Sequence, residues 1–223
     1  MSSTAGAIVI LPMNVVRPLP ESLEGSAPAT WEVLRASLAA HDTPIKTVAF
    51  DSAQGLWRAS AREAVERATR SSKVAFPDVA RVFVEKLSGF SEFTHLVIPS
   101  LFVQGARVEG RTASWDGVER PVEIDAGAWS DRLDEDTKFG GAVPAASLHL
   151  VVLDAGGRVV HERQVGLAVL SRIRLTGNPE LGAPGFEALP VADPFADREA
   201  MGVGIAEALS PWITPRDPAP TVR

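Results

Sequence analysis

The most constraining feature of the sequence is a short apolar run close to its start. Residues Ala7 to Leu11 are all apolar, and Pro12 closes the run directly after them. A continuous apolar run of this length indicates a strand that is buried on both faces, as at the centre of a sheet covered by helices. The sequence therefore predicts an α/β fold built around this central strand.

The elements expected after this strand alternate between helices and strands. Apolar side chains at helical spacing predict helices over residues 30–41, 52–70, 77–88 and 197–212. β-branched and aromatic residues predict strands over residues 45–50 and 95–103. The order is β-α-β-α-α-β-hairpins-α, so we expect one mixed sheet with helices packed on it, an α/β fold that leans towards α+β.

Two hairpins are expected in the second half of the chain. Asp116-Gly117 favours the type I′ turn of a hairpin whose strands span residues 111–115 and 118–124. A second hairpin joins residues 147–153 to 158–165 through a four-residue turn. Its pairing places His149 opposite Glu162.

The length of 223 residues suits one ordinary domain and is too short for two comfortable ones. We expect a single α/β domain over residues 1–213, with long loops over 125–141 and 176–194. The first loop is acidic and lacks periodicity, and the second is rich in proline and glycine. A proline-rich tail is expected over residues 214–223.

Charge and composition exclude several classes of partner and site. The 22 basic and 28 acidic residues give a net charge of −6, the wrong sign for a protein that neutralises phosphates, so no nucleic acid partner is expected. The chain has no cysteine, which excludes disulfides, thiolate zinc sites and a cysteine nucleophile. No apolar run reaches about 18 residues, so no transmembrane segment is predicted.

The motif search predicts no catalytic, cofactor-binding or metal-binding residues, and no cofactor. Gly202 to Glu207 has glutamate where a dinucleotide fingerprint needs its third glycine. In the run His161 to Val165, valine stands where a zinc protease needs its second histidine. Asp131 to Asp136 lacks the ligand spacing of a calcium loop. The histidines are expected at the surface or in the His149–Glu162 pair.

Trp115, Asp116 and Gly117 are the candidate partner-binding residues. Trp115 is the aromatic residue expected on an exposed hairpin, where an aromatic side chain can anchor a partner protein. The alternative is that its ring folds onto the sheet and covers the core.

The element order, the entry Ile8 to Pro12 and the late stretch from Val151 to Val160, with Asp154 and Gly157 in its turn, resemble those of a bacterial envelope group. The group comprises the amino-terminal domain of TolB and the related curli-secretion and penicillin-binding-protein-activator lipoproteins. The resemblance implies a non-enzymatic periplasmic protein, often lipid-anchored to the outer membrane, that works through protein contacts. The chain departs from the group in lacking a lipid-accepting cysteine, and no functional residue is transferred.

Our first hypothesis is a non-enzymatic cell-envelope adaptor or assembly accessory that acts through protein–protein contacts. It would be periplasmic or associated with the outer membrane, and a removed N-terminal signal would supply export and anchoring. Two alternatives stay open: an enzyme of unrecognised type that uses acidic residues of the 125–141 loop, and a cytoplasmic scaffold subunit of a larger assembly. The sequence leaves the oligomeric state open.

Overall fold

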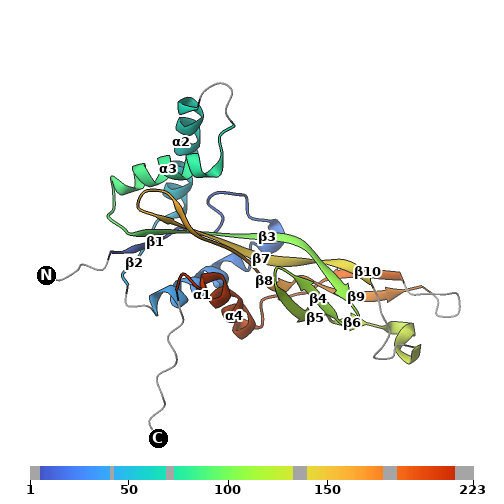
Figure 1. The fold of residues 1–223 in the computed structure, drawn as a ribbon. Helices are drawn as coiled ribbons and strands as arrows, with labels where there is room; N and C mark the ends of the chain where they lie inside the picture. Colours follow the sequence, from blue (N-terminus) through green and yellow to red (C-terminus); the bar gives the residue numbers. More distant parts are fainter. Residues whose placement is uncertain (1–5, 41–42, 69–72, 133–139, 178–184, 214–223) are drawn as a thin grey trace, which may run out of the picture. The chain divides into compact units, whose positions relative to one another are not determined.

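The computed structural model of the protein describes residues 6–40, 43–68, 73–132, 140–177 and 185–213 (Figure 1). It contains four helices and a mixed parallel and antiparallel sheet, which confirms the predicted α/β class. The chain divides into two compact units. Unit 1 comprises Met1–Leu101, His149–Gln164 and Ile205–Arg223, and unit 2 comprises Phe102–Leu148 and Val165–Gly204. Compact units can belong to one domain, so the single domain over 1–213 stays a prediction.

Unit 1 is organised around the first strand, β1 (Ile8–Ile10). β1 lies between β2 (Ile45–Thr47) and β3 (His95–Glu109) and runs parallel to both, with Ile8 in register with Ile45 and His95. All three β1 side chains are buried. The central strand expected from the apolar run is therefore confirmed, and the cause is burial on both of its faces.

Three helices belong wholly to unit 1: α1 (Ala27–Ala39), α2 (Phe50–Arg67) and α3 (Phe76–Ser88). The apolar side chains of α2 and α3 pack with β1 and β3 in one core cluster, in which Phe83 is among the largest fully buried side chains. Pro77 stands in the first turn of α3, where its missing N–H costs nothing. The predicted helix 30–41 begins earlier, at Ala27, with Pro28 in its first turn, and the Thr30 hydroxyl donates to the Ser26 carbonyl there.

A buried asparagine joins the segment after β1 to the middle of β3. The Asn14 side chain donates through Nδ2 to the Leu101 carbonyl and accepts the Leu101 N–H at Oδ1, both at 2.8 Å. Asn14 is 4% exposed and has a φ of 62°, a left-handed conformation that asparagine tolerates better than most residues. The Asn14 amide therefore takes the place of two backbone hydrogen-bond partners, one for the N–H and one for the carbonyl of Leu101.

The second hairpin is formed by β7 (Gly140–Asp154), which pairs with β3 and β8, and by β8 (Val159–Val169). Within its turn, Gly157 has a φ of 78°. A Cβ at Gly157 would stand 2.8 Å from the Cα of Arg81 on α3, so the turn lies directly against that helix. The hairpin expected from the sequence is confirmed.

Unit 2 combines parts of the long strands β3, β7 and β8 with several shorter strands. β4 (Thr112–Trp115) pairs with the end of β3 and with β5 (Val118–Pro121), antiparallel in both cases. A separate sheet has the order β10 (Gly185–Pro190), β9 (Ser171–Thr176) and β6 (Ile124–Asp125). Trp115 and Trp129 lie in the core cluster of this unit.

The two predicted loops are wrong in part. Within 125–141 the chain forms the end of β6, a 3₁₀ helix over Gly127–Arg132 and the start of β7. Within 176–194 it forms β10, because β9 offers an adjacent strand from Gly185↔Thr176 to Pro190↔Ser171. Pairing with a neighbouring strand overrides local composition here. Residues 133–139, 178–184 and the tail 214–223 lie outside the described residues.

Three other boundaries differ from expectation. The strand expected over 45–50 ends at Thr47, because α2 already begins at Phe50. The strand expected over 95–103 continues to Glu109, where it pairs with β4. The last helix, α4, spans Arg198–Leu209: it begins directly after Asp197 as expected but ends before the predicted residue 212. In the described part of the chain, no helix has the length and apolar character needed to cross a membrane.

Candidate functional site: a hollow with an apolar floor and an acidic rim

The predicted turn at Asp116-Gly117 is present between β4 and β5. Both residues have positive φ, 42° for Asp116 and 76° for Gly117, as a type I′ turn requires. Trp115 and Val118 are paired across it. The hairpin prediction is confirmed at this position.

Trp115 is not an exposed anchor. Its side chain is 7% exposed, and its Nε1 donates to the Ala146 carbonyl at 3.3 Å and to the Ser147 hydroxyl at 3.1 Å. A Cβ on Gly166 would stand 2.6 Å from the indole, so the ring lies directly against that glycine. The alternative, in which the ring folds onto the sheet and covers the core, is confirmed, and the expectation of an exposed tryptophan is wrong. A large apolar ring is more stable buried in the core of unit 2 than exposed to water.

Asp116 is also used inside unit 2. Its carboxylate accepts hydrogen bonds from the Ser147 hydroxyl at 2.6 Å and from the Gln104 amide. Ser147 is fully buried, so these contacts hold the turn back against the sheet. Gly117 is the exposed member of the predicted trio, and partner binding at this turn stays a prediction.

The histidines of the second hairpin have structural partners. His149 Nε2 lies 2.8 Å from Glu162 Oε1, which confirms the expected pair. His161 Nε2 lies 2.7 Å from the Ala208 carbonyl in the last turn of α4. Within the described ranges, no three or more His, Asp or Glu side chains gather in a way that could hold a metal ion.

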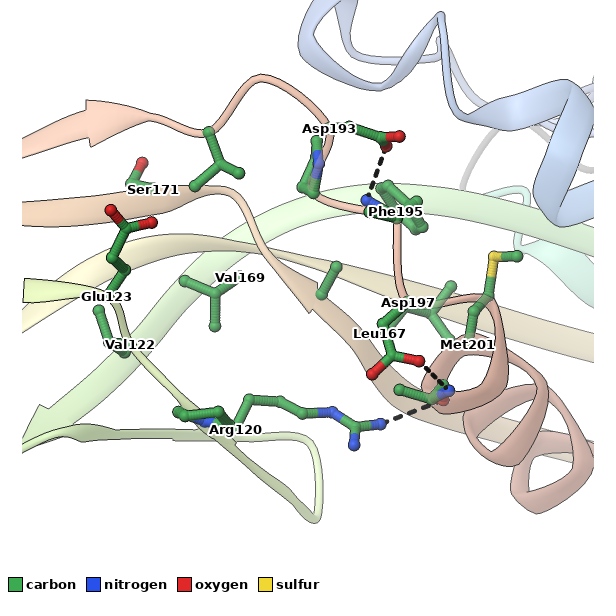
Figure 2. A pocket seen from close by; sticks show the side chains of 16 residues that line it. Arg120, Val122, Glu123, Leu167, Val169, Ser171, Asp193, Phe195, Asp197 and Met201 are labelled. Atoms are coloured by element: carbon green, nitrogen blue, oxygen red, sulfur yellow. Dashed lines mark hydrogen bonds between the residues drawn. The ribbon is translucent and has the colours of Figure 1, made fainter.

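A hollow of about 290 Å³ lies wholly within unit 2 (Figure 2). We call it the unit 2 hollow. Its walls come from the end of β5 and the segment that follows it, from the junction of β8 and β9, from the loop after β10 and from the first turn of α4. The lining residues are Arg120–Glu123, Leu167–Val169, Ser171, Val191, Asp193–Asp197, Ala200 and Met201.

The floor of the unit 2 hollow is apolar and rigidly packed. Val122, Leu167, Phe195 and Met201 are all buried. Leu167 belongs to the end of β8, where consecutive residues from Val165 to Ala168 are buried and the usual alternation of a half-exposed strand is lost. Sequence reasoning missed this floor, although Phe195 between Pro194 and Ala196 was a signal: a large apolar residue in a loop of small and acidic ones.

The rim carries three exposed carboxylates, from Glu123, Asp193 and Asp197. Asp193 Oδ1 accepts the Phe195 N–H at 3.2 Å and so shapes the loop. Asp197 Oδ1 accepts the Ala200 N–H at 2.8 Å and caps α4, which is why the helix begins here. Both carboxylates lie at the mouth of the hollow and order its wall (Figure 2).

Arg120 is the one cation that lines this hollow. Its Nη2 donates to the Ala200 carbonyl at 3.2 Å, and its Nε is buried with no hydrogen-bond partner in the described part of the chain. A buried donor without a partner costs about 1–3 kcal/mol. Through its bond to Ala200, the Arg120 guanidinium joins β5 to the first turn of α4. Its positive charge offsets part of the negative charge of the three rim carboxylates.

The pKa shifts that stand out belong to groups away from the unit 2 hollow. Hydrogen bonds from Lys86 and then Arg67 hold the pKa of Glu63 below its ordinary value, and hydrogen bonds from Glu85 and Glu63 raise that of Arg67. The backbone N–H and side chain of Arg158 lower the pKa of Asp154 in the β7–β8 turn. These shifts belong to surface ion pairs and a turn, which are structural contacts.

Chemically, the unit 2 hollow can accept one apolar group and attract positive charge to its rim. Comparison with known proteins adds no assignment, because no family model and no curated protein matches the sequence.

Proposed function

We propose that the protein is a non-enzymatic adaptor or assembly accessory of the cell envelope, and that it binds a partner protein through the unit 2 hollow. The observation that carries the proposal is the combination of a buried apolar floor with exposed carboxylates at the rim. Protein interfaces concentrate their binding energy in such pockets, where one apolar or aromatic anchor becomes fully desolvated.

The size of the hollow suits a single side chain. Pockets for small molecules and cofactors usually measure roughly 300–1,000 Å³, and this hollow of about 290 Å³ lies at the lower end of that range. It has room for one large apolar side chain presented by another protein. The alternative of an enzyme using acidic residues of the 125–141 loop stays a prediction, because the side chains of residues 131–139 lie outside the described residues.

The charge of the rim specifies the neighbours of that anchor. Glu123, Asp193 and Asp197 bring three negative charges to the mouth, against the positive charge of Arg120 in the lining and that of Arg172, which pairs with Glu123 at 3.5 Å. A partner segment with lysine or arginine beside its apolar anchor would be attracted and oriented by this field. The proposal therefore predicts binding that weakens as salt concentration rises.

Site-specific photo-crosslinking in native cells tests the hollow. A photoreactive side chain at Val169, which lines the hollow, should crosslink one protein, whereas the same side chain at Val203, an exposed position on α4 outside the lining, should not. Ala196→Trp places a ring at the exposed edge of the hollow and should abolish the crosslink, while Ala188→Trp on β10 should preserve it. An identical crosslink in both variants would contradict the proposal.

The envelope location is tested separately. Cell fractionation together with determination of the mature N-terminus should place the protein in the periplasm or at the outer membrane. A purely cytosolic protein would remove the envelope part and leave the scaffold alternative, with the same hollow as its binding site.

A further inference from the structure

Unit 1 contains a second hollow, of about 340 Å³, between the end of α2 and the start of α3. Its lining contains three cations, Arg67, Lys73 and Arg81, and one anion, Asp78. The remaining lining residues are Ala64, Ala68 and Val82, which are small or apolar. In a chain with a net charge of −6, this basic hollow is a local excess of positive charge.

Two of the four charged side chains that line this hollow, Arg67 and Asp78, already have partners. Arg67 pairs with Glu63 at 2.5 Å and with Glu85 at 3.0 Å, so its charge is balanced from both helices. Asp78 Oδ2 accepts the Ala75 N–H at 3.0 Å, which ties that carboxylate to the beginning of α3. Glu63 is further engaged by Lys86 at 2.6 Å.

Among the described residues, Lys73 and Arg81 have no side-chain partner. Neither makes an ion pair or a hydrogen bond through its side chain to any residue that the structure describes. The main chain of Arg81 is held by the close approach of Gly157, so the position from which its side chain extends is fixed. Two unpaired cations that line one hollow attract an anion, and a fixed backbone lowers the entropy cost of binding it.

We propose that the basic hollow binds a phosphoryl group. The guanidinium of Arg81 offers a planar fork that matches two phosphate oxygens, and the ammonium of Lys73 adds a compact charge that can reach a third. Together they neutralise the two negative charges of a phosphate monoester. This site is independent of the unit 2 hollow and has a different ligand chemistry.

Binding of inorganic phosphate to the full chain, measured by calorimetry at low ionic strength and neutral pH, is the first test. Lys73→Gln/Arg81→Gln should weaken binding at least tenfold, because two charge-assisted hydrogen bonds are lost. Arg58→Gln/Arg62→Gln removes two exposed cations of α2 that do not line the hollow and changes net charge equally. This control should bind phosphate like the wild type.

A second arm identifies where the phosphoryl group comes from. Flotation with phosphatidylcholine vesicles, with and without phosphatidic acid, measures recognition of a lipid headgroup. Binding that requires phosphatidic acid and is lost in Lys73→Gln/Arg81→Gln assigns the site to an anionic lipid. Phosphate binding without vesicle binding assigns it to a soluble phosphorylated ligand.

Two results would overturn the proposal: no binding of either probe by the wild-type chain, or equal weakening in the two double variants. Melting temperatures of both variants should match that of the wild type, since all four side chains lie at the surface. The photo-crosslink at Val169 should be unchanged in Lys73→Gln/Arg81→Gln, so failure of either proposal is seen separately.

Discussion

The two compact units differ in what holds them together. Unit 1 has a parallel centre of apolar strands covered by helices, and its core cluster contains Val9, Phe83 and Leu153. Unit 2 has mostly antiparallel strands around Trp115 and Trp129, and side-chain hydrogen bonds lie within its core. Unit 1 therefore depends on apolar volume, whereas unit 2 depends on close fitting of rings, glycines and polar partners.

The largest effect is expected from removing apolar volume in unit 1. Phe83→Ala should lower the free energy of unfolding by about 3–5 kcal/mol, because Phe83 is 0% exposed and its ring lies 5.4 Å from that of Trp57. Phe90→Ala, at a residue 83% exposed just after α3, should change it by less than about 0.5 kcal/mol. Urea unfolding measures both.

Hydrogen exchange on the same variants sharpens the comparison of the two units. If they are separate cooperative units, Phe83→Ala should lower amide protection in unit 1 more than in unit 2. An equal loss of amide protection in both units would show that the two compact units are not separate units of stability.

The next largest effect is expected from replacing Asn14, whose buried side chain bonds to the main chain of Leu101 in unit 1. Asn14→Ala should cost about 3 kcal/mol, since it removes two buried hydrogen bonds and places alanine in a left-handed conformation. Asn14→Gly keeps the conformation and loses only the hydrogen bonds, so it should cost less. Equal melting temperatures for the two variants would show that backbone conformation contributes nothing here.

In unit 2 the corresponding test adds volume. Gly166→Ala should cost about 1–3 kcal/mol, because the new methyl group would displace the indole of Trp115 and the side chain of Val118. The same substitution at Gly202, where a Cβ meets nothing within 4 Å, should stabilise α4 by up to about 1 kcal/mol. Opposite signs in thermal unfolding would confirm that close fitting governs unit 2.

The smallest effect is the pH dependence of the β7–β8 turn in unit 1. The pKa of Asp154 is below its ordinary value, so the ionised carboxylate stabilises the fold above about pH 4, and this contribution is lost as pH falls further. Asp154→Asn should reduce stability by less than about 1 kcal/mol at neutral pH and flatten the pH dependence of stability below about pH 4. A parallel pH profile for wild type and variant would contradict this assignment.

The same contrast explains what could be predicted from the sequence. In unit 1 the apolar run at Ile8–Ile10 and the helical spacing of apolar residues behind Pro77 each indicate which side chains are buried, so the central strand and the helices follow from local pattern. The His149–Glu162 contact followed from hairpin pairing alone.

Unit 2 could be predicted only in its turn. Asp116-Gly117 specifies a conformation by itself, but the burial of Trp115 depends on Gly166 and Ser147, which are distant in sequence. β10 exists because β9 offers it a partner, which composition does not reveal. The unit 2 hollow is formed by four segments that are separate in the sequence, so no local sequence pattern could predict it.

The core of unit 1 has a consequence for synthesis on the ribosome. It includes Val9 from the first strand and Leu153 from a strand near the end of the second third of the 223-residue chain. Most of the polypeptide must therefore emerge from the ribosome before this core can form. Until then, β1 of the nascent chain stays an exposed, aggregation-prone segment. A chaperone that shields the emerging N-terminal part would be most valuable to this protein during that interval.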